Sequence, residues 1–279
     1  MTGSPTWETG GVHLTKHHGL GNDFLVLMDL DGVSPIDPPL ARALCHRRTG
    51  VGADGLIRVT PGRQGADLTM ELLNSDGSAA EMSGNGMRCL AQAAVMAGAA
   101  PASRFTVWTA GGVRHVVHGL GDRPGESRVT VDMGRVGPLA DAPAVEHRSP
   151  PLREAALDVG NPHLVLLVDD PATVEIESVG PTYERQFPSG ANIEWIRVRE
   201  PDTLDLRVWE RGAGATQACG TGACAAAWAA HRWDLVGPRV DVVMPGGGVR
   251  VEIGPDGTVR LTGPAAYVAA VDVEPGWLM

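Results

Sequence analysis

Two short segments of this 279-residue chain each place a small polar side chain directly before a glycine-rich helix start. The first segment is "EMSGNGMRC", with Ser83, and the second is "QACGTGAC", with Cys219, 136 positions later. A helix N-terminus presents unpaired backbone N–H groups and a partial positive charge, and glycines let an anion approach closely. Each segment therefore predicts a cradle for a carboxylate or another oxyanion. Neither segment has the Lys-Ser/Thr ending of a P-loop, so phosphate is the weaker candidate.

The position of Cys219 suggests a reactive thiol. A helix start lowers the pKa of a thiol from about 8.5 towards neutral, which makes the sulfur a usable base or nucleophile. The alternative is a buried structural thiol. If residues 83 and 219 lie on opposite sides of one cleft, a thiolate can remove a proton from one face of a carbon and an opposing group can return one. The helix N–H groups would stabilise the enediolate, and this stereoinversion needs no cofactor.

The two segments belong to a longer internal repeat. A shift of 136 lays residues 68–86 on 204–222, which places Asn74 on Glu210 and Ser83 on Cys219, and it also lays 107–117 on 243–253. Upstream, a shift of 139 lays 21–27 on 160–166 and 55–59 on 194–198. Four matches in the same order with nearly one offset indicate duplication.

The repeat predicts an α+β fold with two pseudo-symmetric domains. Each domain is expected to consist of short, mostly antiparallel strands around one alanine-rich helix, at 85–98 and at 221–233. We expect the domains to span 12–128 and 129–264, with a strand at about 265–279 returning to the first. The crossover is expected in 121–128 and 137–151, and the active site in the cleft between the domains.

Composition narrows the class of function. The formal net charge of −10 argues against a nucleic-acid or anionic-membrane surface, because either would need a basic face. No signal-peptide core or span of roughly 20 apolar residues occurs, which predicts a cytoplasmic protein that acts on a small molecule. The four cysteines fit reduced thiols better than disulfides or zinc ligands. Lys16 is the single lysine, so we expect no pyridoxal phosphate, and we expect no metal or other cofactor.

Five sequence blocks carry a resemblance to a known family. They are "HGLGNDF", "NSDGSAAEMSGNGMRC", "DVGNPH", "GANIEW" and "WERGAGATQACGTGACAAA". With them the chain resembles the diaminopimelate epimerase family from about residue 16 to residue 268. That family has two β-barrel-like domains around central helices, works without a cofactor and uses an amino acid as its substrate. A homodimer is a further expectation.

The resemblance also implies roles for particular residues. It places the proton-transferring pair at Cys219 and Ser83, with His163 and Glu210 beside it. The reacting carboxylate would lie on the backbone of Gly84, Asn85, Gly220 and Thr221. The unreacting amino-acid end of the substrate would contact Asn22, Asn74, Asn161, Asn192, Glu210 and Arg211.

The chain departs from the family pattern at three positions. Ser83 stands where the family has its other catalytic cysteine, and a hydroxyl is much harder to ionise than a thiol. Cys89 lies more than one helical turn further on, so it is a poor replacement. Gly55 stands where some members have a glutamine that contacts the substrate, and Ala215 replaces a glutamate.

The resemblance makes conversion of LL-diaminopimelate to the meso form the leading hypothesis. Two alternatives stay open because of Ser83. One is an isomerase, dehydratase or racemase of another amino acid that uses a Ser/Cys pair for one-sided proton abstraction. The other is a ligand-binding relative that has kept the pocket and lost turnover.

Overall fold

The computed structural model of the protein describes residues 11–80, 82–274 and 277. The chain divides into two compact units. One runs through Val131 and takes up the chain again from Pro264, and the other spans Asp132–Gly263. The dividing point lies inside a strand, β7, and residues 121–128 form the turn before β7 and its first residues. The expected C-terminal segment is strand as far as Val273, and its residues 275–276 and 278–279 lie outside the described part.

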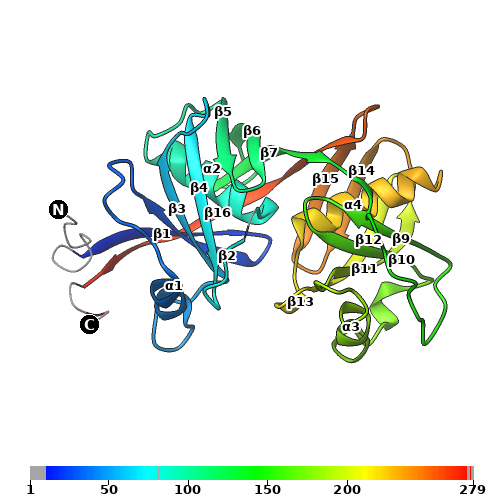
Figure 1. Ribbon diagram of the computed structural model, residues 1–279. Helices are drawn as coiled ribbons and strands as arrows, with labels where there is room; N and C mark the ends of the chain where they lie inside the picture. Colours follow the sequence, from blue (N-terminus) through cyan, green and yellow to red (C-terminus); the bar gives the residue numbers. More distant parts are fainter. Residues whose placement is uncertain (1–10, 81, 275–276, 278–279) are drawn as a thin grey trace. The chain divides into compact units, whose positions relative to one another are not determined.

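The first unit is a closed barrel in which strands surround a helix (Figure 1). Its strands follow one another in the order β1 to β7, and β16 closes the ring by pairing with β1. Two neighbouring pairs, β2–β3 and β4–β5, are parallel, and a helix forms part of the connection within each pair. The elements are β1(Val12–Gly19), β2(Asn22–Met28), α1(Pro38–Cys45), β3(Gly55–Pro61), β4(Leu68–Asn74), α2(Gly84–Met96), β5(Arg104–Thr109), β6(Gly112–Leu120), β7(Glu126–Arg135) and β16(Thr258–Val273).

The second unit repeats this plan around α4. From β15 its sheet runs through β14, β12, β11, β10 and β9 to β8, with β13 beside β12. The parallel pairs are β10–β11 and β12–β14, and α3 and α4 lie in the corresponding connections. The elements are β8(Gly137–Pro138), β9(Arg153–Asp158), β10(Pro162–Leu167), η2(Pro171–Thr173), α3(Ile176–Glu184), β11(Asn192–Glu200), β12(Thr203–Glu210), β13(Gly214–Thr216), α4(Gly220–Arg232), β14(Arg239–Met244) and β15(Gly247–Ile253).

Both central helices are buried on almost every side. Residues 84–94 of α2 are all buried, and ten of the thirteen residues of α4 are buried. Alanine and glycine predominate in α4, and such small side chains let strands approach a helix from several directions. The predicted fold class, two sheet domains that each enclose an apolar helix, is confirmed.

The sequence repeat is real, but two of its local offsets were wrong. Helices α2 and α4 begin 136 residues apart, as predicted. The equivalent hairpins close at Thr109 and Met244, 135 residues apart, because the glycine-rich turn lets the alignment slip by one position. The offset of 139 also fails for β3 and β11, as their pairing with β4 and β12 shows.

In that pairing Gly55 lies opposite Asn74 and Ile193 lies opposite Trp209. The preceding residue of β11, Asn192, therefore corresponds to Gly55 at an offset of 137. A slip of two residues preserves the alternation of a strand, so the sequence pattern did not reveal it.

Candidate active site

Ser83 is the N-cap of α2, at a residue with extended backbone. Its Oγ accepts a hydrogen bond from the N–H of Gly86 at 3.0 Å. This satisfies one of the unpaired donors at the helix start, which is the usual role of serine at this position. Gly84 and Asn85 follow at the first two helical positions and are both buried.

The asparagines assigned to the first unit behave differently from one another. The amide of Asn22 contacts Asn85, whose Nδ2 donates to Asn22 Oδ1 at 3.0 Å. Asn74 ends β4, and its Nδ2 donates to Ser78 Oγ at 3.0 Å within its own turn. The structure thus brings Asn22 and Asn85 together and leaves Asn74 in a turn of the type that asparagine commonly stabilises.

Steric crowding explains why position 55 is a glycine. A Cβ at this position would lie 2.9 Å from the carbonyl oxygen of Leu73 and 3.1 Å from the ring of Phe24. Side chains do not tolerate a backbone atom at that distance, so the place of a longer residue is already filled.

Cys219 is the N-cap of α4 and matches Ser83 in its local geometry. Its Sγ accepts from the N–H of Gly222 at 3.3 Å and lies 3.4 Å from Thr221 Oγ1. The carboxyl group of Glu210, at the end of β12, is an electrostatic neighbour of Cys219 and raises the pKa of its thiol. Thr216 of the short strand β13 donates its hydroxyl to Glu210 Oε1. The thiol is therefore held between a helix start and a carboxyl group.

The expected acidity of Cys219 is wrong in its direction. The pKa of the thiol is raised well above its ordinary value, first by burial and then by the negative charges of Glu210 and Glu194. The hydrogen bonds from Thr221 and the Gly222 N–H act in the opposite direction but are outweighed. Burial also raises the pKa of Glu210. A buried thiol beside two carboxyl groups keeps its proton until a neighbouring group accepts it.

His163 lies in β10 and is fully buried, with partners at both ring nitrogens. Its Nδ1 lies 2.7 Å from Glu194 Oε1 and its Nε2 lies 2.9 Å from Asn161 Oδ1. Both ring nitrogens therefore have a polar partner, which fixes the orientation of the imidazole inside the cluster. The Nδ2 of Asn192 is a more distant neighbour of Nε2, at 3.4 Å.

Glu194 belongs to this cluster, although it was not among the site residues predicted from the sequence. It lies in β11, is fully buried, and its Oε2 has no hydrogen-bond partner among the described residues. A Cβ at Gly222 would lie 2.7 Å from Glu194 Oε1 and 3.3 Å from Cys219 Sγ, so these two atoms are at most 6.0 Å apart. Alternation was the available signal, since Asn192 and Glu194 share one face of a strand.

Arg211 is tied to the same cluster through its backbone. Its N–H donates to Asn192 Oδ1 at 2.9 Å, and its guanidinium Nη1 donates to the carbonyl oxygen of Ser189 at 3.1 Å. The structure therefore connects Asn161, His163, Asn192 and Arg211 on one side and Glu210, Cys219 and Thr221 on the other, with Glu194 between them. Gly220 begins α4 and is buried.

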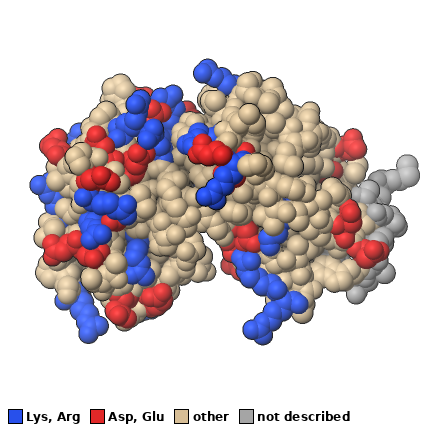
Figure 2. All heavy atoms as spheres, turned by 180° about the vertical axis from the view of Figure 1, so that it is seen from behind, with Lys and Arg blue, Asp and Glu red and all other residues tan. Residues whose placement is uncertain are grey.

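Other charged side chains have structural partners. Arg250 forms a bidentate pair with Asp241, at 2.8 and 2.9 Å, and Arg207 Nη1 donates to the carbonyl oxygen of Val174 at 2.9 Å. On the face seen in Figure 2, acidic and basic side chains are interspersed. Among the described residues, no group of three or more His, Cys, Asp or Glu side chains could hold a metal ion, and no helix has the length and apolarity to cross a membrane.

The sequence of this chain is similar to those of known proteins. A family model described as diaminopimelate epimerase matches residues 14–137 and 155–268. The chain belongs to the diaminopimelate epimerase family. A diaminopimelate epimerase of Desulfitobacterium hafniense is 42% identical over 275 residues, which cover 92% of this chain and 96% of the relative. One of Moorella thermoacetica is 41% identical and covers 92% and 97%.

Solved structures show that the fold extends beyond this epimerase family. A hydroxyproline epimerase from Agrobacterium vitis, with bound trans-4-hydroxy-L-proline, has a TM-score of 0.72 at 18% identity and covers 95% of this chain and 93% of that one. A PhzF-family phenazine biosynthesis protein of Bacillus anthracis has a TM-score of 0.72 at 16% identity, with coverage of 95% and 100%. At these identities the likeness concerns the fold alone.

Proposed function

We propose that the protein converts LL-diaminopimelate to the meso form, with Cys219 as the base and Ser83 as the opposing proton donor. The buried thiol of Cys219 at the start of α4 is the observation that carries this proposal, since a nucleophilic sulfur there accepts from a helix-start N–H and has the carboxyl group of Glu210 as an electrostatic neighbour. Relatives named diaminopimelate epimerase at about 40% identity support the choice of substrate. The reduced thiol that the reaction needs fits a cytoplasmic setting.

The first step is removal of the α-proton. Glu210 accepts the thiol proton of Cys219, and the thiolate takes the proton from Cα of the substrate. The electron pair of the broken C–H bond moves into the adjacent carboxylate, which becomes an enediolate. Backbone N–H groups at the helix start stabilise its negative charge, which is larger in the transition state than in the substrate.

The second step is return of a proton on the opposite face. The hydroxyl of Ser83 donates to the carbanionic Cα, and solvent then protonates the resulting alkoxide. Glu210 releases to solvent the proton that it took from Cys219, which restores the starting state of the protein. The N–H of Gly86, which donates to Ser83 Oγ, stabilises the developing charge. In the reverse direction Ser83 would have to act as a base, for which a hydroxyl is poorly suited. Because both directions pass through the same transition state, epimerisation is slow from either isomer.

The surroundings of Ser83 favour a second candidate function, which is one-sided proton abstraction from another amino acid. The residues that correspond to His163 and Glu210 in the first unit are Phe24 and Asn74, and neither of them titrates. An isomerase, dehydratase or racemase with one strong base would fit such a pair. A ligand-binding relative without turnover is the third candidate.

Isotope exchange separates the three candidates. The protein is incubated with LL- and, separately, with meso-diaminopimelate in deuterated water, and α-deuterium and configuration are followed by NMR and chiral chromatography. Inversion with uptake of one deuterium supports the epimerase. Exchange from one isomer without inversion shows a one-base enzyme. Calorimetric binding of both isomers without exchange shows a protein that only binds its ligand.

A further inference from the structure

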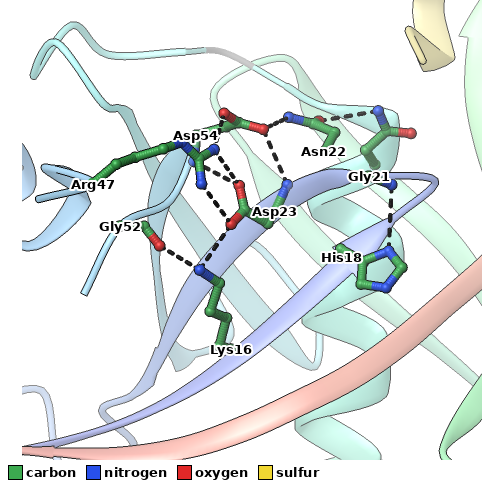
Figure 3. A network of polar contacts seen from close by, with 9 residues as sticks. Lys16, His18, Gly21, Asn22, Asp23, Arg47, Gly52 and Asp54 are labelled. Carbon is green, nitrogen blue, oxygen red and sulfur yellow. Dashed lines mark hydrogen bonds and ion pairs between the residues drawn. The ribbon is translucent and has the colours of Figure 1, made fainter. Parts of the chain in front are cut away.

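Four polar side chains of the first unit form a hydrogen-bond relay that has one direction. Arg88 Nη2 donates to Asn85 Oδ1 at 2.7 Å, and Asn85 Nδ2 donates to Asn22 Oδ1 at 3.0 Å. Asn22 Nδ2 then donates to Asp54 Oδ2 at 2.8 Å. Figure 3 shows the Asp54 end of the relay beside the surrounding charges. The relay joins the start of α2 to the loop that precedes β3.

Chemistry at the two ends fixes the direction of the relay. A guanidinium can only donate, and an ionised carboxylate can only accept. An asparagine amide inside such a chain cannot exchange its Oδ1 and Nδ2 positions by a 180° rotation, because this would place a donor against a donor or an oxygen against an oxygen. The orientations of the Asn22 and Asn85 amides therefore follow from their neighbours, not from an arbitrary assignment of oxygen and nitrogen.

The acceptor end is held by further charges. Asp54 accepts from the backbone N–H of Asp23 at 3.1 Å and from Arg47 Nη2 at 2.6 Å, so both of its oxygens are engaged. Arg47 also forms a bidentate pair with Asp23, at 2.7 and 3.1 Å, and Lys16 Nζ lies 2.9 Å from the same carboxylate. Burial alone would raise the pKa of Asp23, but hydrogen bonds from Arg47 and Lys16 outweigh it and lower the pKa to about 2.

The donor end is rigid as well. Arg88 is fully buried, and its Nε donates to the carbonyl oxygen of Pro264 at 3.0 Å while its Nη1 donates to that of Gly84 at 3.2 Å. The guanidinium fills the space beside Gly19, where a Cβ would lie 2.8 Å from Nη2. Three donors in a planar group leave Arg88 little freedom to rotate.

We infer that Asp54 and Arg88 are positioning residues that set the amide orientation of Asn22 and, through it, its contact with the substrate. The inference rests on the proposed function for the identity of the substrate. Oδ1 and one N–H of Asn22 are engaged in the relay, which leaves its second N–H for a hydrogen-bond acceptor outside the relay. A carboxylate at the unreacting end of the amino acid is such an acceptor.

The kinetic test removes the obligatory acceptor and keeps its shape. Asp54→Asn is expected to raise KM for diaminopimelate about tenfold and to leave kcat within threefold, because the contact serves the unreacting end of the substrate. Asp31→Asn, on an exposed aspartate of the same unit, is the matched control and should leave KM unchanged. In an Asn22→Ala background, Asp54→Asn should not raise KM further. Additive effects on KM in this cycle would overturn the inference.

A second measurement needs neither turnover nor a variant. In the ¹⁵N–¹H spectrum of the wild-type protein, the side-chain amide of Asn22 should show one proton protected from exchange with water and one that exchanges rapidly. Two rapidly exchanging protons would overturn the relay even if the protein is an active epimerase. A protected proton in a protein that does not turn over diaminopimelate would uphold the relay and refute only the proposed function.

Discussion

The starts of α2 and α4 share the same capping geometry but are surrounded by different side chains. Ser83 and Cys219 are both N-caps, and each accepts from the N–H of the third residue of its helix. Around Cys219, however, lie His163, Glu194 and Glu210. At the matching place beside Gly86 the neighbour is Ile57, whose Cδ1 would lie 3.3 Å from an added Cβ. The residues that correspond to His163 and Glu210 are Phe24 and Asn74.

This difference separates the parts of the duplicated unit that folding needs from the part that chemistry needs. The cap, the glycines and the small helical side chains recur because each helix must begin inside a sheet and stay buried. Buried charged groups destabilise a fold unless they are paired. At the start of α4 they are accompanied by a buried thiol, whereas at the start of α2 the buried Arg88 and Asp23 are held by hydrogen bonds and ion pairs. The start of α2 is thus surrounded by amides with fixed orientation and by permanent ion pairs.

Loss of the sulfur at position 219 is expected to have the largest effect. Cys219→Ser keeps an N-cap side chain but replaces the base with a second hydroxyl, so kcat for deuterium exchange should fall by about 10³-fold or more. Cys224→Ala, at a buried cysteine of the same helix, is the control and should retain most of the activity. A loss of less than tenfold in Cys219→Ser would show that the two starts do not differ in the way proposed.

Making the two starts alike is the next test. Ser83→Cys should raise kcat by roughly 10²–10³-fold, because a thiol ionises far more readily than a hydroxyl and can serve in both directions. The gain in kcat/KM should be equal in the two directions, because a catalyst does not change the equilibrium between the isomers. Ser83→Ala serves as the control for helix capping and should cost about 1 kcal/mol of stability. Unchanged kinetics in Ser83→Cys would show that position 83 does not limit turnover.

The carboxyl group beside Cys219 should affect turnover and thiol reactivity in opposite directions. Glu210→Gln removes the proton acceptor and should lower kcat about 100-fold. The same change removes a negative charge that raises the pKa of Cys219, so the pKa should fall and iodoacetamide should modify the thiol faster at pH 8. Mass spectrometry of the Cys219 peptide measures this rate. Slower alkylation in Glu210→Gln would contradict the assigned cause of the raised pKa.

The permanent charges of the first unit should contribute to stability rather than to catalysis. The pKa of Asp23 is about 2 in the folded protein against about 3.9 for a free aspartate, so its contribution is full above pH 4 and is lost as the pH falls through 2. Asp23→Asn should lower the free energy of unfolding at pH 7 by about 2 kcal/mol, and this difference should vanish near pH 2. Urea denaturation at several pH values measures it, and a difference independent of pH would refute the assignment.

The repeat, the fold class and the places of both helix starts could be predicted from the amino-acid sequence. Glycine after a capping residue, followed by a run of small apolar residues, is a local pattern that needs no tertiary information. The exact residue-by-residue alignment of the two repeats could not be read from such a local pattern. The hairpins and the β3–β11 correspondence were displaced by one and two residues, because turns rich in glycine and alternating strands match almost as well after a short slip.

The pKa values and hydrogen-bond directions at the two helix starts could not be predicted without the tertiary structure. A helix terminus taken alone predicts an acidic Cys219, but burial and the approach of Glu194 from β11 and Glu210 from β12 raise the pKa of its thiol. The same holds for the relay from Arg88 to Asp54, whose members come from α2, β2 and the loop before β3. A sequence pattern records which groups are present along the chain. Their pKa values and hydrogen-bond directions depend on distances and burial that arise only when remote segments pack together.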